Sequence, residues 1–198
     1  MSLELVNTLA TFGTFVVIAA TAIAAIVQLR HARSSNQIAA LSELRETMET
    51  PDFLAAQQFA AGALKARMQE PAFRYQYQEP TARTDETRPL IAKINALGNF
   101  YEGMGLLTKT GLVDRGLVFE LFSYQAISTW EELAPLAAIA RRRLGDALWE
   151  NFEYLVVLSQ DWMAGHPKGT YPAGVRRIGL KDEWLDADKQ YAASLAPA

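Results

Sequence analysis

Cysteine is absent from the 198-residue chain, and histidine occurs only at His31 and His166. Without thiols the protein can form neither a disulfide-stapled extracellular module nor a Cys-ligated zinc site. The chain also lacks the Glu-x-x-His pairs of helical di-iron centres and the Gly-x-Ser-x-Gly elbow of many hydrolases. The sequence therefore predicts a protein that is not an enzyme and that holds no metal or cofactor.

Basic residues do not outnumber acidic ones, since 19 Lys and Arg stand against 22 Asp and Glu, for a net charge of −3. Affinity for nucleic acid comes largely from basic side chains that neutralise phosphates, so nucleic acid is not an expected partner. Residues 141–143 and 176–177 form two short basic runs. We interpret them as the solvated last turn of a helix and a basic loop.

Charge is missing altogether from the 25 residues between Glu4 and Arg30. As a helix this run would measure roughly 37 Å, which exceeds the ~30 Å hydrocarbon core of a bilayer. A long buried helix of a soluble domain normally keeps a polar face, and a signal peptide normally begins with basic residues and has a shorter apolar core. The run therefore predicts a transmembrane anchor over residues 1–30.

The residues that flank this run predict its orientation. Arg30 and Arg33 follow it, whereas the acidic Glu4 precedes it. Basic residues next to a span favour the cytoplasmic side of a membrane. We therefore expect the N-terminus outside and residues 31–198 in the cytoplasm.

One face of the expected span carries small side chains. Small residues let membrane helices pack closely, although this span has no GxxxG motif. The face is therefore a candidate surface for self-association, and it consists of Ala10, Thr14, Thr21 and Ala25.

The rest of the chain has helical periodicity, and no segment alternates as a strand would. Neither Gly nor Pro occurs between Thr14 and Thr50, so the anchor should continue as one stiff helix into the cytoplasm. The sequence thus predicts an all-α protein. It consists of a single N-terminal transmembrane helix, a cytosolic bundle of about five to six helices over residues 31–164, and an irregular Gly/Pro-rich tail over residues 165–198 with a short helix near Trp184.

Prolines and capping residues predict several helix boundaries inside the bundle. Thr50 and Pro51 should begin a helix that Pro71 ends, and a polar loop should follow. Gly111 has the place of a residue just past a helix end, and Asp114 that of the next N-cap. A helical hairpin is thus expected over residues 90–134, a short helix starting or kinking at Pro135, and a last long helix over residues 148–164.

Glycines and polar residues meet on one side of the first hairpin helix. Gly98 and Gly105 weaken that helix by about 1 kcal/mol each relative to alanine, which suggests that another helix approaches closely there. The neighbouring polar side chains form a solvated edge with an acidic helix start, a satisfied internal network, or a site for a polar ligand or a partner's basic group. The candidate site comprises Asn95, Asn99 and Glu102, with Glu150, Asn151 and Glu153 from the last helix.

Several segments together resemble a known family. They are residues 28–37 (QLRHARSSNQ), 97–107 (LGNFYEGMGLL), 111–114 (GLVD) and 147–155 (ALWENFEYL). In this order they resemble an uncharacterised bacterial family of short membrane-anchored proteins, known only as a domain of unknown function. The resemblance implies a bacterial inner-membrane protein with one N-terminal span and a helical cytosolic domain. It implies no activity, cofactor or site residue.

These observations favour a membrane-anchored, non-enzymatic interaction or adaptor protein. A protein partner or a second copy of the chain is expected in addition to the membrane. The first alternative is a membrane-bound stress or defence effector that acts through oligomerisation of its span. The second alternative is a small-ligand sensor or an enzyme.

Overall fold

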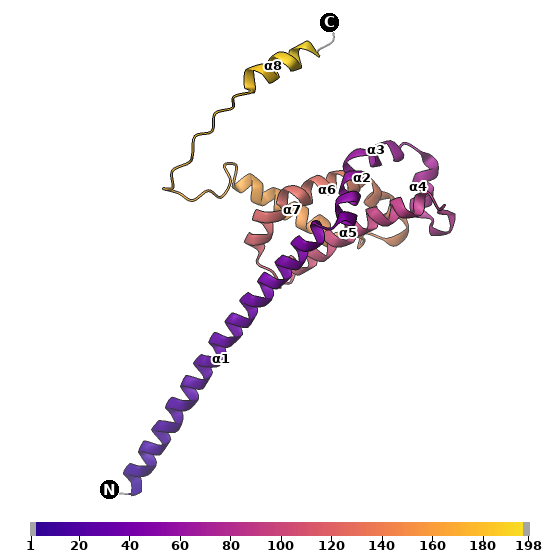
Figure 1. The fold of residues 1–198 in the computed structure, drawn as a ribbon. Helices are drawn as coiled ribbons and strands as arrows, with labels where there is room; N and C mark the ends of the chain where they lie inside the picture. Colours follow the sequence, from indigo (N-terminus) through magenta and orange to yellow (C-terminus); the bar gives the residue numbers. More distant parts are fainter. Residues whose placement is uncertain (1–2, 196–198) are drawn as a thin grey trace. The chain divides into compact units, whose positions relative to one another are not determined.

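A computed structural model describes residues 3–195, apart from the side chains of residues 5, 6, 9 and 10. These residues form α-helices and one short 3-10 helix, with no strand among them, which confirms the predicted all-α class (Figure 1). The chain divides into two compact units, Met1–Pro167 and Lys168–Ala198. The first unit contains α1 (Leu3–Met48), α2 (Pro51–Gly62), α3 (Leu64–Arg67), α4 (Pro71–Gln78), η1 (Pro80–Ala82), α5 (Thr87–Lys109), α6 (Arg115–Leu144) and α7 (Glu150–Gly165).

Helix α1 runs through two different environments. It is one uninterrupted helix of 46 residues, as the absence of Gly and Pro after Thr14 predicts. Its apolar first part is long and apolar enough to cross a membrane, and no side chain in the most apolar window is buried. Its last turns instead pack against the domain core through Ala40, Leu41, Leu44 and Met48. A single rigid element therefore links the apolar run to the folded domain.

The segment after α1 begins as predicted and then differs. The hydroxyl oxygen of Thr50 accepts a hydrogen bond from the N–H of Phe53 (3.3 Å), so Thr50 caps α2. The expected single helix up to Pro71 is broken into α2 and α3, and Pro71 begins α4 instead of ending a helix. Proline suits the first turn of a helix, where its missing N–H has no intrahelical partner. Burial of Phe73 in the core then stabilises the new helix.

The predicted hairpin consists of α5 and α6. Gly111 has a φ of 71°, the left-handed conformation typical of a residue just past a helix end. The carboxylate of Asp114 accepts from the N–H of Leu117 (3.0 Å) and caps α6. Pro135 lies inside α6, so of the two predicted alternatives a helix start is wrong, and a kink at Pro135 stays a prediction. Leu133 and Leu136 are buried on either side of it, and this packing offsets the hydrogen bond that proline removes.

Helix α7 packs along α5 and α6 and completes the core. Tyr101 of α5 is fully buried, and its ring stacks on Phe152 of α7 at a centroid distance of 4.8 Å. Trp130 of α6 meets the ring of Phe152 edge-on at 4.9 Å. These three rings join α5, α6 and α7.

The second unit, Lys168–Ala198, is mostly irregular and contains α8 (Leu185–Ser194). This confirms the short helix expected near Trp184. In the irregular part the guanidinium of Arg177 lies over the ring of Tyr171, 4.5 Å from its centroid, and the Tyr171 hydroxyl donates to the carbonyl of Arg176 (3.2 Å). The basic run at residues 176–177 is thus part of a loop, as predicted.

Candidate functional site

The predicted polar cluster lies where the N-terminus of α7 meets α5. A Cβ atom added to Gly105 would stand 2.0 Å from the carbonyl oxygen of Asn151, and one added to Gly98 would stand 2.0 Å from the ring of Trp149. Real Cβ atoms do not approach other atoms so closely. The two glycines therefore permit the contact between α5 and the start of α7, which confirms the expected close approach of another helix.

Glu102 binds the first turn of α7 with both carboxylate oxygens. One oxygen accepts from the side-chain amide of Asn151 (2.7 Å), and the other accepts from the backbone N–H of Phe152 (2.9 Å). That N–H is one of the four that an α-helix leaves without an internal acceptor. The carboxylate also faces the positive end of the helix dipole. Glu102 of α5 therefore caps α7 from outside, in place of an ordinary N-cap side chain.

Trp149, just before α7, turns the chain into this contact. Its φ of 54° and ψ of 33° are left-handed, a conformation that costs a non-glycine residue about 1–2 kcal/mol. Its indole N–H donates to the side-chain oxygen of Asn99 (3.1 Å), and its ring is buried against Gly98. These contacts offset the cost of the strained backbone and hold the turn in place.

The remaining candidate residues divide between two places. Lys109 donates to the side-chain oxygen of Asn151 (3.1 Å) and lies 3.8 Å from the carboxylate of Glu150. Glu153 instead pairs with Arg141 of α6 (2.7 Å). The structure thus brings Asn99, Glu102, Glu150 and Asn151 together and leaves Glu153 outside the cluster. The contacts described here hold helices together, and a recognition role for the cluster stays a prediction.

Arg141 is a structural residue that the sequence interpretation missed, because it is not a solvated last-turn cation. Its Nε–H donates to the carbonyl of Leu148 (3.0 Å), and its guanidinium lies 6.0 Å from the centroid of Trp130. With the Glu153 ion pair, Arg141 fixes the connection between α6 and α7. The available signal was its position four residues after Ala137, which is buried on the same face of α6.

Asn95 lies beside Asn99 in a small polar cavity of about 230 Å³. Arg83 and Tyr77 line it from the α4 side, and Arg83 donates to the carbonyl of Tyr77 (3.4 Å). Burial raises the pKa of Tyr77 to about 12, so its phenol is neutral at physiological pH. The lining offers hydrogen-bond donors to a small polar solute. Among its described residues there is no serine, cysteine or histidine that would serve as a nucleophile or base.

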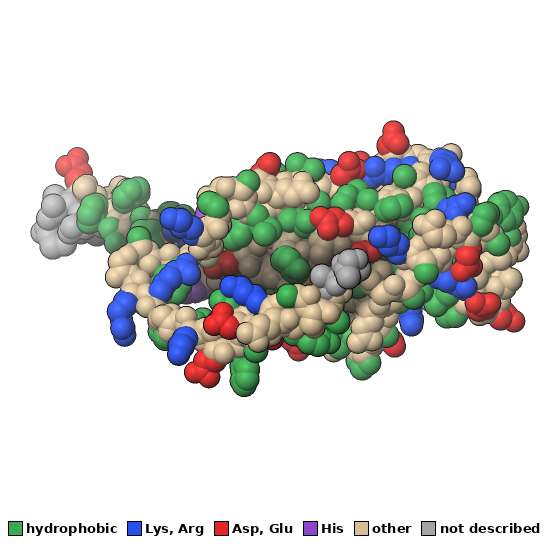
Figure 2. Space-filling model, turned by 90° about the horizontal axis from the view of Figure 1, so that it is seen from above, with side chains coloured by type: hydrophobic (Ala, Val, Ile, Leu, Met, Phe, Trp, Pro, Cys, Tyr) green, Lys and Arg blue, Asp and Glu red, His purple; other side chains and the backbone are tan. Residues whose placement is uncertain are grey.

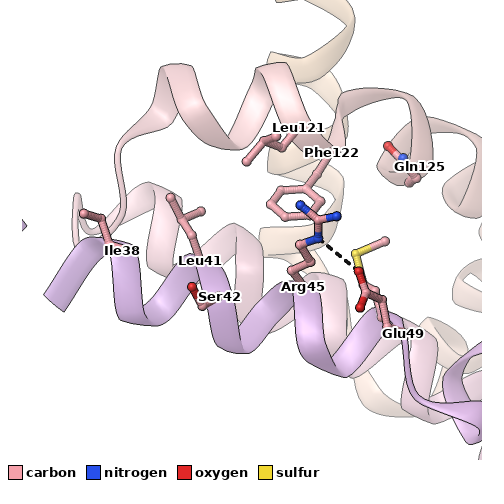
Figure 3. Close-up of a pocket in the computed structure, with 9 residues that line it drawn as sticks. Ile38, Leu41, Ser42, Arg45, Glu49, Leu121, Phe122 and Gln125 are labelled. Atoms are coloured by element: carbon pink, nitrogen blue, oxygen red, sulfur yellow. Dashed lines mark hydrogen bonds and ion pairs between the residues drawn. The ribbon is translucent and has the colours of Figure 1, made fainter. Parts of the chain in front are cut away.

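A mainly apolar groove of about 470 Å³ lies between α1 and α6 (Figure 3). Figure 3 shows Ile38 and Leu41 toward the Leu121 end, with Gln125 at the other end. The ion pair between Arg45 and Glu49 (3.0 Å) lies on the α1 wall of the groove. The sequence predicted that this part of α1 continues the anchor as a helix, but it could not predict that α6 would form the opposite wall. The lining residues are Ile38, Leu41, Ser42, Arg45, Met48, Glu49, Leu121, Phe122 and Gln125.

The candidate self-association face of the predicted span lies on the exposed part of α1. Thr14, Thr21 and Ala25 are exposed, and the side chain of Ala10 lies outside the described residues. The hydroxyl of Thr21 donates to the carbonyl of Val17 in its own helix (2.8 Å). Such bonds within a helix reduce the cost of placing a hydroxyl in lipid.

Among the described residues, no group of three or more His, Asp and Glu side chains is arranged to hold a metal ion. The family described as a domain of unknown function (DUF4760) matches residues 15–162. The match extends from the apolar part of α1 into α7 and ends before the second unit. No curated protein and no solved structure matches the chain.

Proposed function

The chain belongs to the DUF4760 family, a domain of unknown function, and from the geometry of its first helix we propose that it is a membrane-anchored interaction or adaptor protein without enzymatic activity. The resemblance noted in the sequence is thereby confirmed at the level of the family. The observation that carries the proposal is the division of α1 into an exposed apolar part and a part packed into the domain core. Such a helix holds the domain at a fixed distance from a bilayer.

The polar contacts favour interaction over chemistry. Glu102, Asn99 and Asn151 are all engaged in joining α5 to α7. Acidic, basic and hydrophobic side chains are interspersed on the face shown in Figure 2. This mixture supports a protein partner, because nucleic acid would favour a field of basic charge. Anchoring benefits an adaptor by raising the local concentration of its domain at the membrane.

We propose the bacterial inner membrane as the location, with one span, the N-terminus outside and the helical domain in the cytoplasm. The support is the sequence itself, since Arg30 and Arg33 follow the apolar run and Glu4 precedes it. In this orientation the groove between α1 and α6 faces the cytoplasm.

Two arginines in the middle of the apolar run are expected to release the protein from membranes. The apolar side chains favour insertion by roughly 2–5 kcal/mol, and each central arginine opposes it by about 2.5–3.5 kcal/mol. The full-length protein should sediment with membranes and resist extraction at alkaline pH, whereas the Ile18→Arg, Ala22→Arg double variant should appear in the soluble fraction. Ile18→Leu with Ala22→Leu is the matched control and should stay in the membrane. Equal partition of all three proteins would contradict a membrane span.

The adaptor proposal predicts a partner in fixed ratio when the full-length protein is purified gently in detergent from its native membrane. Leu121, half exposed at the groove, gives a position to perturb without opening the core. If the partner binds there, Leu121→Glu should lower its recovery severalfold, because binding would bury an unpaired charge. Leu106→Glu, at an equally exposed position of α5 outside the groove, is the control. The mass of the purified complex in detergent gives the number of copies of each protein in it.

A purified complex of another composition would favour the effector alternative. A homo-oligomer without any other protein, which Thr14→Leu together with Thr21→Leu converts to a monomer, would assign the small-residue face to self-association and contradict the adaptor proposal. An oligomeric state that the double variant leaves unchanged would remove the support for that alternative.

A further inference from the structure

The turn between α5 and α6 lies on the span side of the domain. The guanidinium of Arg33 donates to the carbonyl of Gly111 in this turn (3.3 Å). Arg33 follows Leu29, the end of the uncharged run, by only four residues, or roughly 6 Å of helix. A turn in contact with Arg33 is therefore level with the headgroup region of any bilayer that α1 spans.

The direction of α6 supports this placement. Later residues of α1 meet later residues of α6, because Arg33 contacts Gly111 while Ile38 to Glu49 share the groove with Leu121 to Gln125 (Figure 3). The two helices thus run in the same direction along the groove, away from the span. The start of α6 and the turn before it are the part of this hairpin nearest to the apolar run.

This turn exposes apolar surface beside basic charge. Leu112 is 62% exposed, and Leu117, in the first turn of α6, is 46% exposed. Four basic side chains lie within four residues of the turn or of the end of the apolar run, and two acidic side chains, Asp114 and Glu150, lie near them. The basic ones are Arg30, Arg33, Lys109 and Arg115. Exposed leucines flanked by arginine and lysine suit the boundary between acyl chains and anionic headgroups.

We propose that the turn between α5 and α6 is a second, peripheral membrane contact, in which Leu112 enters the headgroup layer of an anionic bilayer and Arg33 and Arg115 face lipid phosphates. This inference rests on the proposed anchoring of α1. With the span and the turn both in contact with lipid, the domain has two points of attachment. It is therefore held in one tilt relative to the membrane and does not swing on the span alone.

The cysteine-free sequence allows single-site labelling without a background. Full-length Leu112→Cys, labelled with an environment-sensitive fluorophore and reconstituted in vesicles of phosphatidylcholine and phosphatidylglycerol, should show a blue-shifted emission. A quencher attached near the headgroup end of the lipid chains should reduce that emission. Leu144→Cys, similarly exposed at the other end of α6, should show neither effect. Ile18→Cys, in the apolar run, reports insertion of the span through a quencher placed deep in the bilayer.

Each outcome separates the contact from the anchor. Quenching at residue 18 and at residue 112 supports both. Quenching at residue 18 with residue 112 behaving like residue 144 overturns the contact and leaves the anchor in place. A blue shift at residue 112 without lipid quenching means that protein covers the turn, and it also overturns the contact. No quenching at residue 18 overturns the anchor and, with it, this inference. Equal quenching at residue 112 in vesicles of phosphatidylcholine alone would overturn the role of the arginines.

Discussion

Gly105→Ala is expected to destabilise the domain by about 3 kcal/mol, the upper end of the usual cost of overpacking and a large part of the 5–15 kcal/mol that stabilises a typical domain. The added Cβ would stand 2.0 Å from the carbonyl oxygen of Asn151, a backbone atom that cannot rotate away as the end of a flexible side chain can. The first turn of α7 would have to move, and the contacts of Glu102 with it would lengthen. Thermal or urea unfolding of the full-length protein in detergent, followed by circular dichroism, measures the loss.

Gly103→Ala is the matched control on the same helix. A Cβ at Gly103 would have no atom within 4 Å except those of its chain neighbours and of its own helix backbone. Alanine is favoured over glycine inside a helix by about 1 kcal/mol, so this variant should be slightly more stable than the natural protein. If Gly105→Ala were as stable as Gly103→Ala, the close contact between α5 and α7 described here would be wrong.

Removal of the Glu102 carboxylate is the second change with a large expected effect. Glu102→Ala should lower the free energy of unfolding by roughly 2–4 kcal/mol, since it removes the cap of α7 and leaves the Phe152 N–H and the Asn151 amide without their acceptor. Glu102→Gln keeps one acceptor oxygen but loses the charge, and should fall about midway. Denaturant unfolding of the full-length protein gives all the values.

Glu131→Ala is the control for this series, because Glu131 is exposed on α6 and its removal should change stability by less than about 0.5 kcal/mol. Unchanged stability of Glu102→Ala, together with loss of partner binding, would contradict the capping role. That result would show that the polar cluster recognises a partner or ligand, which is the alternative that the sequence left open.

Signals within a few residues of each other predicted much of the fold. Thr50 and Asp114 were identified as N-caps because each stands just before a helical pattern, and both cap helices in the structure. Gly111 was likewise identified from its place just past a helical pattern, and it follows the end of α5 in the left-handed conformation. Pro71 and Pro135 misled, because proline is compatible with a helix start, a helix end or, when packing compensates, a helix interior. Burial of distant residues decides among these, and no local pattern contains that information.

For the candidate site, too, local sequence patterns predicted only part of the structure. The spacing of Gly98 and Gly105 predicted that another helix comes close, but the sequence could not identify the start of α7 as that helix. Glu102 and Phe152 are 50 residues apart, so their hydrogen bond depends on the tertiary fold. Arg141 was misinterpreted for the same reason, since its acceptor, the Leu148 carbonyl, lies beyond a helix end. The residue types indicated where helices meet, but the sequence did not indicate which residues form the contacts.

Because α1 passes without interruption from the apolar run into the domain, it also fixes the rotational angle between the two about the helix axis. In an α-helix each residue turns the chain by about 100°, so the number of residues between Arg30 and Ile38 fixes the direction in which the domain faces relative to the small-residue face of the apolar run. One residue more or fewer between Arg33 and Ile38 would turn the groove to another direction relative to the apolar run and separate Arg33 from Gly111. Seven more would nearly restore the bearing while raising the domain by about 10 Å. The length of this short stretch thus fixes which way the groove faces relative to the apolar run.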